Sequence, residues 1–513
     1  MARYKEYDYR QGKFIPVSFD KQILPGTFEY TLNYLIDQEL DLSLFDDRYS
    51  NDDTGAPAYD PAILLKIILY AYSRGITSSR KIEQCCRENI IFMALSADTQ
   101  PHFTTIADFI ATLDADSITL FLEVLLVCDE LNLIGRQMFA IDGVKLPSNA
   151  AKEWSGTKED LTNKKEKMEK MIRQMITRHK KTDGTEQNKE VTGQEEQYVA
   201  TLKQNVKKIR TWLKQHDDKP GKTGKPIKSN ITDNESATMK TSHGVVQGYD
   251  GVAVVDDKHQ IIVNAEVFGA PQEHDLLQPM VEGASDNLAA IGIPDVFDKT
   301  KLTADSGFHT EKNMQALMEE GIDAYVADTQ FRKRDPRFLD RDRYKERFKK
   351  EHAAAHGTTT TYTVRCFTMS EDKTHCICPA GKRLHRNGAN VIVKGKRAIK
   401  FRSNKTDCRV CALRKNCLRH PDHAETRQVH FFQGRAPHLP ESFTEKMKRK
   451  IDSVKGRLIY NKRLATVEPV FANICSTLRL DRFTLRGKRK VNSQWLLYCT
   501  VHNLLKVHRY GYA

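Results

Sequence analysis

The feature that most constrains the fold is a succession of strand and helix patterns between residues 137 and 326. The run Met138–Ile141 is short and apolar, which predicts a buried strand. Two longer apolar runs, Val245–Val255 and Gln260–Phe268, flank a polar turn and predict a hairpin. Two further strand patterns follow, each preceded by a helical one, at residues 301–304 and 322–326. Three antiparallel strands followed by alternating helices and strands predict a mixed five-stranded α/β sheet.

The remaining segments divide by composition around this sheet. Charged helical patterns interrupt it after the first strand, and a Cys-, Thr- and strand-rich segment follows the last one. A length of 513 residues suggests roughly three to four domain-sized units. We expect a helical N-terminal domain for DNA binding or dimerisation (1–135), the first strand of the core (136–155), a helical hairpin insertion with its linker (156–230), the rest of the core (231–330), a Cys-rich β insertion (331–440) and basic C-terminal helices that complete the core (441–513).

The N-terminal segment carries mostly helical patterns. Asp60-Pro61 is an N-cap followed by proline at the first helical position, so a buried helix is expected over Ala62–Tyr72. Helices are also expected over Arg80–Leu95 and Thr105–Leu113, the second opened by a capping box of Thr105 and Asp108. The turn-rich linker between them allows either a helix-turn-helix that docks on DNA or an ordinary helical hairpin, and spacing alone favours the hairpin.

The charge balance indicates a class of partner. The chain has 81 Lys and Arg against 67 Asp and Glu, a net charge of +14, which points to a polyanion and most simply to nucleic acid. Basic runs lie near the C-terminus, at Lys448-Arg449-Lys450 and Lys488-Arg489-Lys490. No apolar run approaches the ~20 residues of a membrane span, and the start has no apolar core for a signal peptide. We therefore expect a cytoplasmic protein with no membrane partner.

Two aspartates stand out by their position at strand ends. Asp142 ends the first strand of the core, and Asp305 directly follows the fourth. These two strands should lie side by side at the centre of the sheet, where paired carboxylates would suit Mg²⁺ or Mn²⁺. The alternative is that each aspartate merely starts an ordinary turn. That alternative is favoured for either residue alone, whereas the pair in this strand order favours a functional site.

A third carboxylate is expected from a helix packed against the sheet, and Glu468 is the candidate. Its neighbours Val467, Val470 and Phe471 suggest a half-buried acid, which needs a partner such as a metal ion. The alternative is a solvent-facing glutamate before a helix break at Pro469.

Several motifs, taken in order, resemble one family. They are Ala140-Ile141-Asp142-Gly143, Ala304-Asp305-Ser306-Gly307, Tyr460-x-x-Arg463 followed by Glu468-Pro469-Val470-Phe471, the stretch from Thr232-Asp233 to Gly248-Tyr249, and the N-terminal segments Ser79–Glu83 and Thr104–Phe109. Their order is similar to that in bacterial insertion-sequence transposases of the DDE type, members of the cut-and-paste transposase superfamily. The resemblance spans nearly the whole chain.

The resemblance implies an RNase H-like catalytic core in which Asp142, Asp305 and Glu468 hold two Mg²⁺ or Mn²⁺ ions. It places Tyr460 and Arg463 near the DNA backbone. The implied function is a DNA transposase that cleaves transposon ends by phosphodiester hydrolysis and joins them to target DNA by strand transfer. Implied partners are double-stranded DNA, namely terminal inverted repeats and target, and a second copy in a homodimer on DNA. The implied location is the bacterial cytoplasm, on the nucleoid when DNA is bound.

Two positions depart from the pattern of the family. The related motif usually places three residues between its arginine and its glutamate, whereas four stand between Arg463 and Glu468. The lysine expected seven positions after the glutamate falls on Cys475. Its role in DNA contact could therefore pass to Lys488 or Lys490.

The cysteines form a separate cluster, because six of the eleven fall between Cys366 and Cys417. Cys408-x-x-Cys411 has the spacing of a zinc knuckle, and Cys378 and Cys417 could complete a four-sulfur site for structural Zn²⁺. The alternative is a set of buried free thiols in a β-rich insertion.

Two other function classes compete with a transposase. One is a catalytically retired RNase H-like DNA-binding regulator with a zinc ribbon, and the other is a non-mobile RNase H-like nuclease. The presence of all three acids favours an enzyme over a regulator. Inverted repeats flanking the coding region would separate a transposase from a nuclease that lacks specific end recognition.

Overall fold

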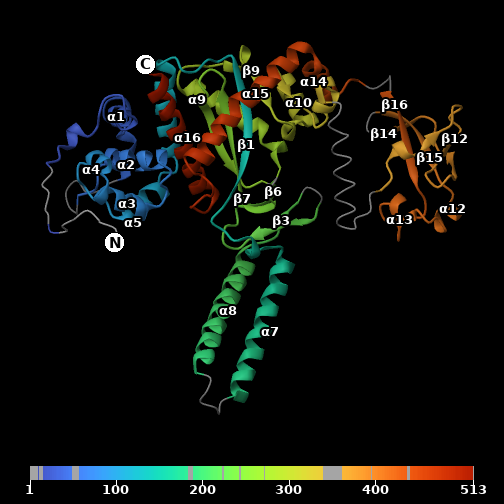
Figure 1. Ribbon diagram of the computed structural model, residues 1–513, viewed down its shortest axis with the longest axis horizontal. Helices are drawn as coiled ribbons and strands as arrows, with labels where there is room; N and C mark the ends of the chain where they lie inside the picture. The colour runs from blue at the N-terminus through green and yellow to red at the C-terminus, as the bar shows by residue number, and fades with distance from the viewer. Residues whose placement is uncertain are drawn as a thin grey trace, which may run out of the picture. The chain divides into compact units, whose positions relative to one another are not determined.

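The computed structural model describes residues 10, 16–48, 57–182, 189–221, 224–241, 244–270, 272–338, 361–393, 396–435 and 440–511 (Figure 1). It divides into two compact units, each treated separately below. Unit 1 consists of Met1–Asp328 and Ser453–Ala513, and unit 2 consists of Thr329–Asp452. No helix of the described residues is both long enough and apolar enough to cross a membrane.

A mixed six-stranded sheet forms the centre of unit 1. Its strands are β1 (Met138–Pro147), β6 (Ala237–Thr241), β7 (Gly244–Asp256), β8 (Ile262–Phe268), β9 (Lys301–Ala304) and β10 (Ala324–Val326). The strand path runs β10-β9-β1-β7-β6, and β8 also pairs with β7. Strands β1, β9 and β10 are parallel, whereas β1, β7 and β8 are successively antiparallel.

The sheet confirms the mixed α/β arrangement but has one strand more than the five predicted. The additional strand is β6, which pairs with the first half of β7 from Ala237↔Gly248 to Thr241↔Gly244. Its sequence, Ala-Thr-Met-Lys-Thr, is short and largely polar, so it lacks the apolar run that marks the other strands. The predicted adjacency of the first and fourth strands is confirmed by the register Ile141↔Ala304.

Helices from distant parts of the chain pack against this sheet. α15 (Val454–Ala472) contacts β1, β9 and β10, while α9 (Leu277–Ala290) contacts β7 and β8 (Figure 1). α10 (Glu311–Glu319) connects β9 to β10. The last helix, α16 (Lys488–Tyr510), contacts β8 and also the N-terminal helices, so it joins the sheet to the start of the chain.

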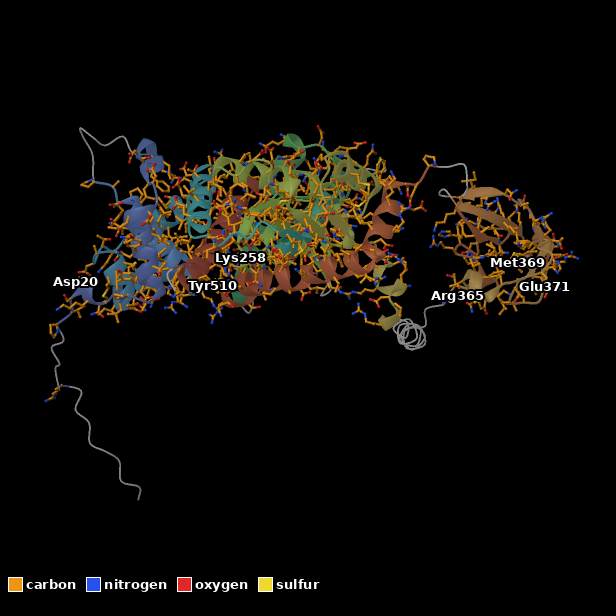
Figure 2. The ribbon with its side chains drawn as sticks, turned by 90° about the horizontal axis from the view of Figure 1, so that it is seen from above. Asp20, Lys258, Arg365, Met369, Glu371 and Tyr510 are labelled. Atoms are coloured by element: carbon orange, nitrogen blue, oxygen red, sulfur yellow. The ribbon has the colours of Figure 1, made fainter. Side chains whose placement is uncertain are left out.

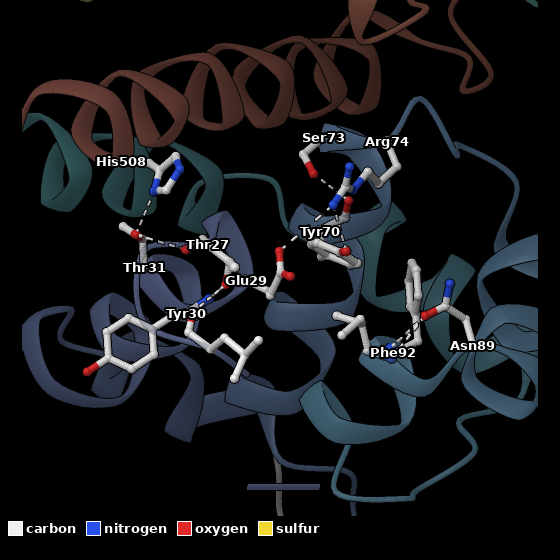
Figure 3. A network of polar contacts seen from close by, with 12 residues as sticks. Thr27, Glu29, Tyr30, Thr31, Tyr70, Ser73, Arg74, Asn89, Phe92 and His508 are labelled. Atoms are coloured by element: carbon white, nitrogen blue, oxygen red, sulfur yellow. Dashed lines mark hydrogen bonds and ion pairs between the residues drawn. The ribbon is translucent and has the colours of Figure 1, made fainter. Parts of the chain in front are cut away.

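The N-terminal helices are α1 (Phe28–Tyr34), α2 (Pro61–Ser73), α3 (Ser79–Glu88), α4 (Ile90–Leu95), α5 (Phe103–Ala111) and α6 (Asp116–Glu130). Polar contacts fix them to one another and to α16 (Figure 3). The Thr31 hydroxyl of α1 lies 2.8 Å from Nδ1 of His508 in α16, and Arg74 at the end of α2 lies 3.8 Å from the Glu29 carboxylate of α1.

Two details of the predicted N-terminal helices are wrong. The helix expected over Arg80–Leu95 is divided at Asn89, whose extended backbone ends α3 and whose side chain caps α4 through the Ile91 N–H. α5 begins two residues earlier than expected, and its N-cap is His102 rather than Thr105. In both cases a polar side chain accepts orphan N–H groups at a position that apolar periodicity does not mark.

The helical insertion is a hairpin of two long helices lying side by side, α7 (Lys158–Thr182) and α8 (Lys189–Gln215) (Figure 1). Its base contains a small apolar cluster of Leu161, Ile209 and Trp212. Short strand pairs lie near this base: β2 (Ser155–Gly156) with β5 (Ser229–Asn230), and β3 (Lys219–Pro220) with β4 (Pro226–Ile227).

Unit 2 is built on an antiparallel sheet of β11 (Thr368–Met369), β12 (His375–Ile377), β13 (Arg383–Arg386), β14 (Val391–Val393), β15 (Lys396–Arg402) and β16 (Gln428–Arg435). It also contains α12 (Lys405–Arg409), α13 (Arg414–Cys417) and α14 (Phe443–Asp452). The buried residues of its core are Phe367, Cys376, Leu384, Ile399, Phe401 and Val429. Figure 2 draws its side chains and labels Met369 and Glu371 on the β11 side.

Side chains of α16 cover the outer edge of β8. Asn503, which is fully buried, accepts the Ile262 N–H and donates to the Ile262 carbonyl, both at 2.9 Å. Asn492 accepts the Val267 N–H at 2.9 Å. Near the far end of the helix, His259 stacks on Tyr510 with ring centroids 4.4 Å apart (Figure 2 labels Lys258 and Tyr510). The edge strand therefore has asparagine side chains where a neighbouring strand would otherwise pair.

His502, next to Asn503, should make unfolding depend on pH. Its Nε2 donates to the Gln260 carbonyl at 2.9 Å, so Nδ1 is left to accept from the Asn473 amide at 3.0 Å. Burial lowers the pKa of His502 from 6.5 to about 4. Between these values the unfolded chain binds a proton that the folded chain does not. Stability should therefore fall as pH drops from about 6.5 to about 4, by about 3 kcal/mol.

The measurement is urea unfolding of the wild type and of His502→Gln across this range. The glutamine side chain of the variant keeps an amide hydrogen-bonding group but cannot titrate, so the variant should lose less stability than the wild type as the pH falls. Parallel curves for the two proteins would contradict the assignment.

Candidate active site

Two carboxylates lie close together where the parallel ladder between β1 and β9 ends. Asp142 lies in β1 just after the last residue that pairs with β9, and Asp305 directly follows β9. Because β1 and β9 are parallel neighbours with Ile141 opposite Ala304, the two aspartates lie at the same level, just beyond the β1–β9 ladder. The prediction that Asp142 ends its strand is wrong, because β1 continues to Pro147 through its pairing with β7, where Asp142 is opposite Ala253. The side chain of Asp142 is 25% exposed and that of Asp305 is 42% exposed, so solvent reaches both.

A buried arginine from α15 links the two acids. Arg463 Nη1 lies 2.7 Å from Asp142 Oδ2, and its Nη2 lies 3.5 Å from Asp305 Oδ1. The guanidinium also lies over the ring of Tyr460, 5.8 Å from its centroid. Arg463 and Tyr460 belong to the buried stripe of α15, which continues through Thr466, Val467 and Val470. One helix face thus brings both motif residues to the paired acids.

Burial and neighbouring charges have opposing effects on the pKa of Asp142. Burial raises the pKa of the Asp142 carboxyl, the Arg463 guanidinium and the Gly143 N–H oppose that rise, and the charge of Asp305 adds to it. Burial also raises the pKa of the Tyr460 hydroxyl, against the lowering effect of Arg463. A cation shared by two carboxylates is therefore what keeps Asp142 able to ionise here.

Two more carboxylates lie beside the pair, and sequence reasoning missed both. Each packs against the glycine of an Asp-Gly or Asp-Ser-Gly motif. A Cβ at Gly143 would lie 2.7 Å from Asp250 Oδ1, and a Cβ at Gly307 would lie 2.0 Å from Glu273 Oε2. The sequence signal for these two acids lies in the glycines, because a residue without a side chain leaves room for a neighbouring carboxylate.

Asp250 is the most unusual of these acids. It is fully buried in β7, opposite Lys145 of β1, and neither of its carboxylate oxygens has a hydrogen-bond partner among the described residues. Burial raises its pKa to about 7, with a further rise from Glu273 and Asp142 that Lys145 opposes. Lys145 itself donates to Glu273 at 2.6 Å. A buried carboxyl without partners is costly, which marks this position as more than structural.

Glu468 lies outside the buried face of α15. It is exposed, so the half-buried setting predicted for it is wrong, and no described residue forms a hydrogen bond or ion pair with it. The reason is geometric: Glu468 follows Arg463 by five positions, which is about 140° around a helix. Its apolar neighbours Val467 and Val470 face the core instead.

The helix is irregular at the next residue, Pro469, which lies inside α15. Proline has no N–H to donate to the carbonyl four positions earlier. That carbonyl, of Ala465, accepts the side chain of Gln260 at 3.0 Å instead. A π-helical turn over Asn473–Thr477 follows.

The basic residues expected to contact DNA lie in both units. In unit 1, Lys488 pairs with Glu266 at 2.8 Å and Arg489 pairs with Asp114, whereas Lys490 is exposed. Lys448, Arg449 and Lys450 lie on α14 of unit 2, where Arg449 pairs with Glu441 at 2.9 Å. Part of each basic run is therefore already balanced by acids.

The candidate cysteine ligands Cys378, Cys408, Cys411 and Cys417 all line one cavity of unit 2. In the part of the chain that the structure describes, no three His, Cys, Asp or Glu side chains are arranged so that they could hold a metal ion as they stand. This holds for the cysteines as well as for the acids of unit 1.

Comparison with known families gives two matches. A model described as a transposase DDE domain matches residues 377–508, and one described as a transposase domain (DUF772) matches residues 17–112. The first span includes Tyr460, Arg463 and Glu468, and the second covers α1 to α5; neither includes Asp142 or Asp305. No curated protein and no solved structure matches the chain. One chain thus matches a transposase domain near its N-terminus and a transposase DDE domain towards its C-terminus, and together these matches support an insertion-sequence transposase of the DDE type.

Proposed function

We propose that this transposase cleaves transposon ends by phosphodiester hydrolysis and joins them to target DNA by strand transfer. One observation carries the proposal: Asp142 and Asp305 lie at the same level, just beyond the parallel ladder of β1 and β9, and share the Arg463 guanidinium. Paired carboxylates suit the hydrolysis of a phosphodiester, because they can hold the metal cations that must lie beside the phosphate. Water and then a DNA 3′-hydroxyl serve as nucleophiles in this scheme, so it needs no covalent protein–DNA intermediate.

The donor set at this site suits Mg²⁺ or Mn²⁺, which prefer carboxylate oxygens. The orphaned oxygens of buried Asp250, beside Asp142, support a cation at this place, because a bound ion would offset the cost of burying them. Asp142 and Asp305 would hold the ions, with Glu468 as the third acid that the resemblance implies. When bound, two such ions activate water and stabilise charge on the leaving oxygen.

Glu468 can join the other acids only after a local change in α15, because it is exposed. Pro469 lowers the cost of such a change, since the helix already lacks one hydrogen bond there. Asp250 is the alternative third acid, because its buried carboxyl is close enough to be influenced by the charge of Asp142. It too would have to move, since its register partner is Lys145 whereas that of Asp142 is Ala253, so the two side chains leave opposite faces of the ladder.

The remaining residues of the site orient the substrate in this proposal. Arg463, released from one carboxylate, can donate two hydrogen bonds to a phosphate from its planar guanidinium. Tyr460 lies beside this guanidinium, and its ring would help to hold Arg463 in place. Lys490 is exposed at the start of α16 and can contact the DNA backbone. Synapsis of two transposon ends would need a second copy of the chain.

Replacing either aspartate should separate catalysis from binding. Asp142→Asn and Asp305→Asn should each abolish cleavage of a DNA duplex bearing the transposon end, because the amide cannot balance the charge of a metal ion. Both variants should still bind that duplex in a gel-shift assay. Asp286→Asn, which changes an exposed acid of α9, is the control and should cleave normally. Full Mg²⁺-dependent cleavage by either variant would refute the assignment.

The third acid can be decided by two isosteric variants. If Glu468 completes the site, Glu468→Gln should eliminate both end cleavage and strand transfer and leave the fold and DNA binding intact. Asp250→Asn should then retain cleavage, since its neutral amide matches the shape of the buried carboxyl. The opposite pattern, with an active Glu468→Gln and an inactive Asp250→Asn, would transfer the role to Asp250.

The contribution of α14 to DNA binding should appear in the salt dependence of affinity. Removing one basic side chain that neutralises a phosphate should lower the slope of log affinity against log salt by about 0.9, because fewer counterions are released. Replacing Lys448, Arg449 and Lys450 together by alanine should therefore lower the slope by roughly 2 to 3. Replacing Lys373, Arg383 and Arg386, three exposed basic residues of the same unit, removes equal charge and should change the slope less. Equal slopes in all three proteins would mean that α14 presents only a solvated face.

A further inference from the structure

Unit 2 contains a small cavity, about 30 Å³ in volume, with four cysteines in its wall. They come from separate places: Cys378 follows β12, Cys408 lies in α12, Cys411 lies between α12 and α13, and Cys417 ends α13. The other two cysteines of the unit are elsewhere, since Cys366 is exposed and Cys376 belongs to the hydrophobic core. The fold thus divides six cysteines into a group of four and two that stand apart.

The four sulfurs share one environment. Cys378, Cys408, Cys411 and Cys417 are all half-buried, and each lines the same cavity. Cysteine sulfurs gathered in this way are the ligands that Zn²⁺ prefers in structural sites.

The surroundings of the cavity supply hydrogen-bond donors to sulfur. The Lys382 N–H donates to Cys378 Sγ at 3.3 Å, and the Ser403 hydroxyl lies 2.9 Å from Cys408 Sγ. Arg427 also lines the cavity, and its buried Nε has no acceptor among the described residues. Such donors and an unmatched positive charge favour an anionic centre.

The segment that carries three of the cysteines lacks an apolar core of its own. Between residues 404 and 427, Leu418 alone is buried. The two helices there, α12 and α13, have only five and four residues. Arg414 supplies most of the side-chain hydrogen bonds within the segment, to the carbonyls of Cys408, Pro421 and Ala424. Apolar burial cannot account for an ordered segment of this kind, so another cross-link is needed.

We propose that Cys378, Cys408, Cys411 and Cys417 bind one structural Zn²⁺ that holds this segment against β12 and β13. A tetrahedral four-sulfur site is closed, with Zn–S distances of about 2.3 Å and no position open for water, which excludes a catalytic role. The thiols have to turn inward to reach those distances, because they now stand apart around the cavity. His420 and His423, which sequence spacing left as alternatives, are exposed and do not line the cavity.

The test begins with the full chain purified under reducing conditions. Metal analysis should find about one zinc per chain, and Co²⁺ in its place should give the visible absorption of a tetrahedral thiolate site. Removing the metal with a chelator should lower the thermal midpoint and expose residues 404–427 to protease, and added Zn²⁺ should restore both. A metal-free chain that stays folded and binds no Co²⁺ would overturn the proposal.

Single replacements identify the ligands. Cys378→Ser, Cys408→Ser, Cys411→Ser and Cys417→Ser should each lose the bound zinc, whereas Cys366→Ser, which changes an exposed cysteine of the same unit, should keep it. Equal zinc loss in Cys366→Ser would overturn the assignment, as would a disulfide among the four found by mass spectrometry of unreduced protein. Zinc content is independent of catalysis, so Asp142→Asn should carry as much zinc as the wild type.

Discussion

The candidate site of unit 1 depends on an arginine that holds two negatively charged aspartates close together. Asp142 lies within β1 and Asp305 directly follows the neighbouring strand β9, and without compensation their repulsion would favour protonation of one of them. The compensation comes from Arg463, which is 321 residues beyond Asp142 in the chain. Together with the buried Val467 and Val470, this side chain holds α15 against β1 and β9. The placement of Tyr460, Glu468 and Pro469 depends on that packing.

The charges around this contact form a wider balance. Arg463 and Lys145 face Asp142, Asp305, Asp250 and Glu273, so acids outnumber bases two to one. Two glycines make room for the extra acids. An excess of negative charge of this kind would repel a phosphate alone. In the function proposed above, cations that arrive with the phosphate would offset both this repulsion and the repulsion among the acids themselves.

Local patterns predict what depends on local sequence. Apolar runs mark five strands of the sheet and the adjacency of Asp142 and Asp305, because a buried strand needs continuous apolar residues. They do not mark the end of β1, which continues past Asp142 to Pro147. β6 escapes such a pattern because its polar sequence is held by pairing with β7. Asp250 and Glu273 cannot be found in this way, since only strand register and tertiary packing bring them to the site. The sequence neighbours of Glu468 suggest burial, whereas its exposure depends on which helix face turns inward.

The contacts between the asparagines of α16 and strand β8 can form only late in synthesis, because α16 is the last helix of the chain. Ile262 of the edge strand receives its partner, Asn503, only after 241 further residues have been made. At a ribosomal rate of about 5–20 residues per second, that interval is roughly 10 to 50 s. Throughout it, the outer N–H and C=O groups of β8 have no α16 to bind, and a strand in that condition can pair with another nascent chain. Translation speed and chaperone access over this interval should therefore influence how much of the protein reaches its native fold.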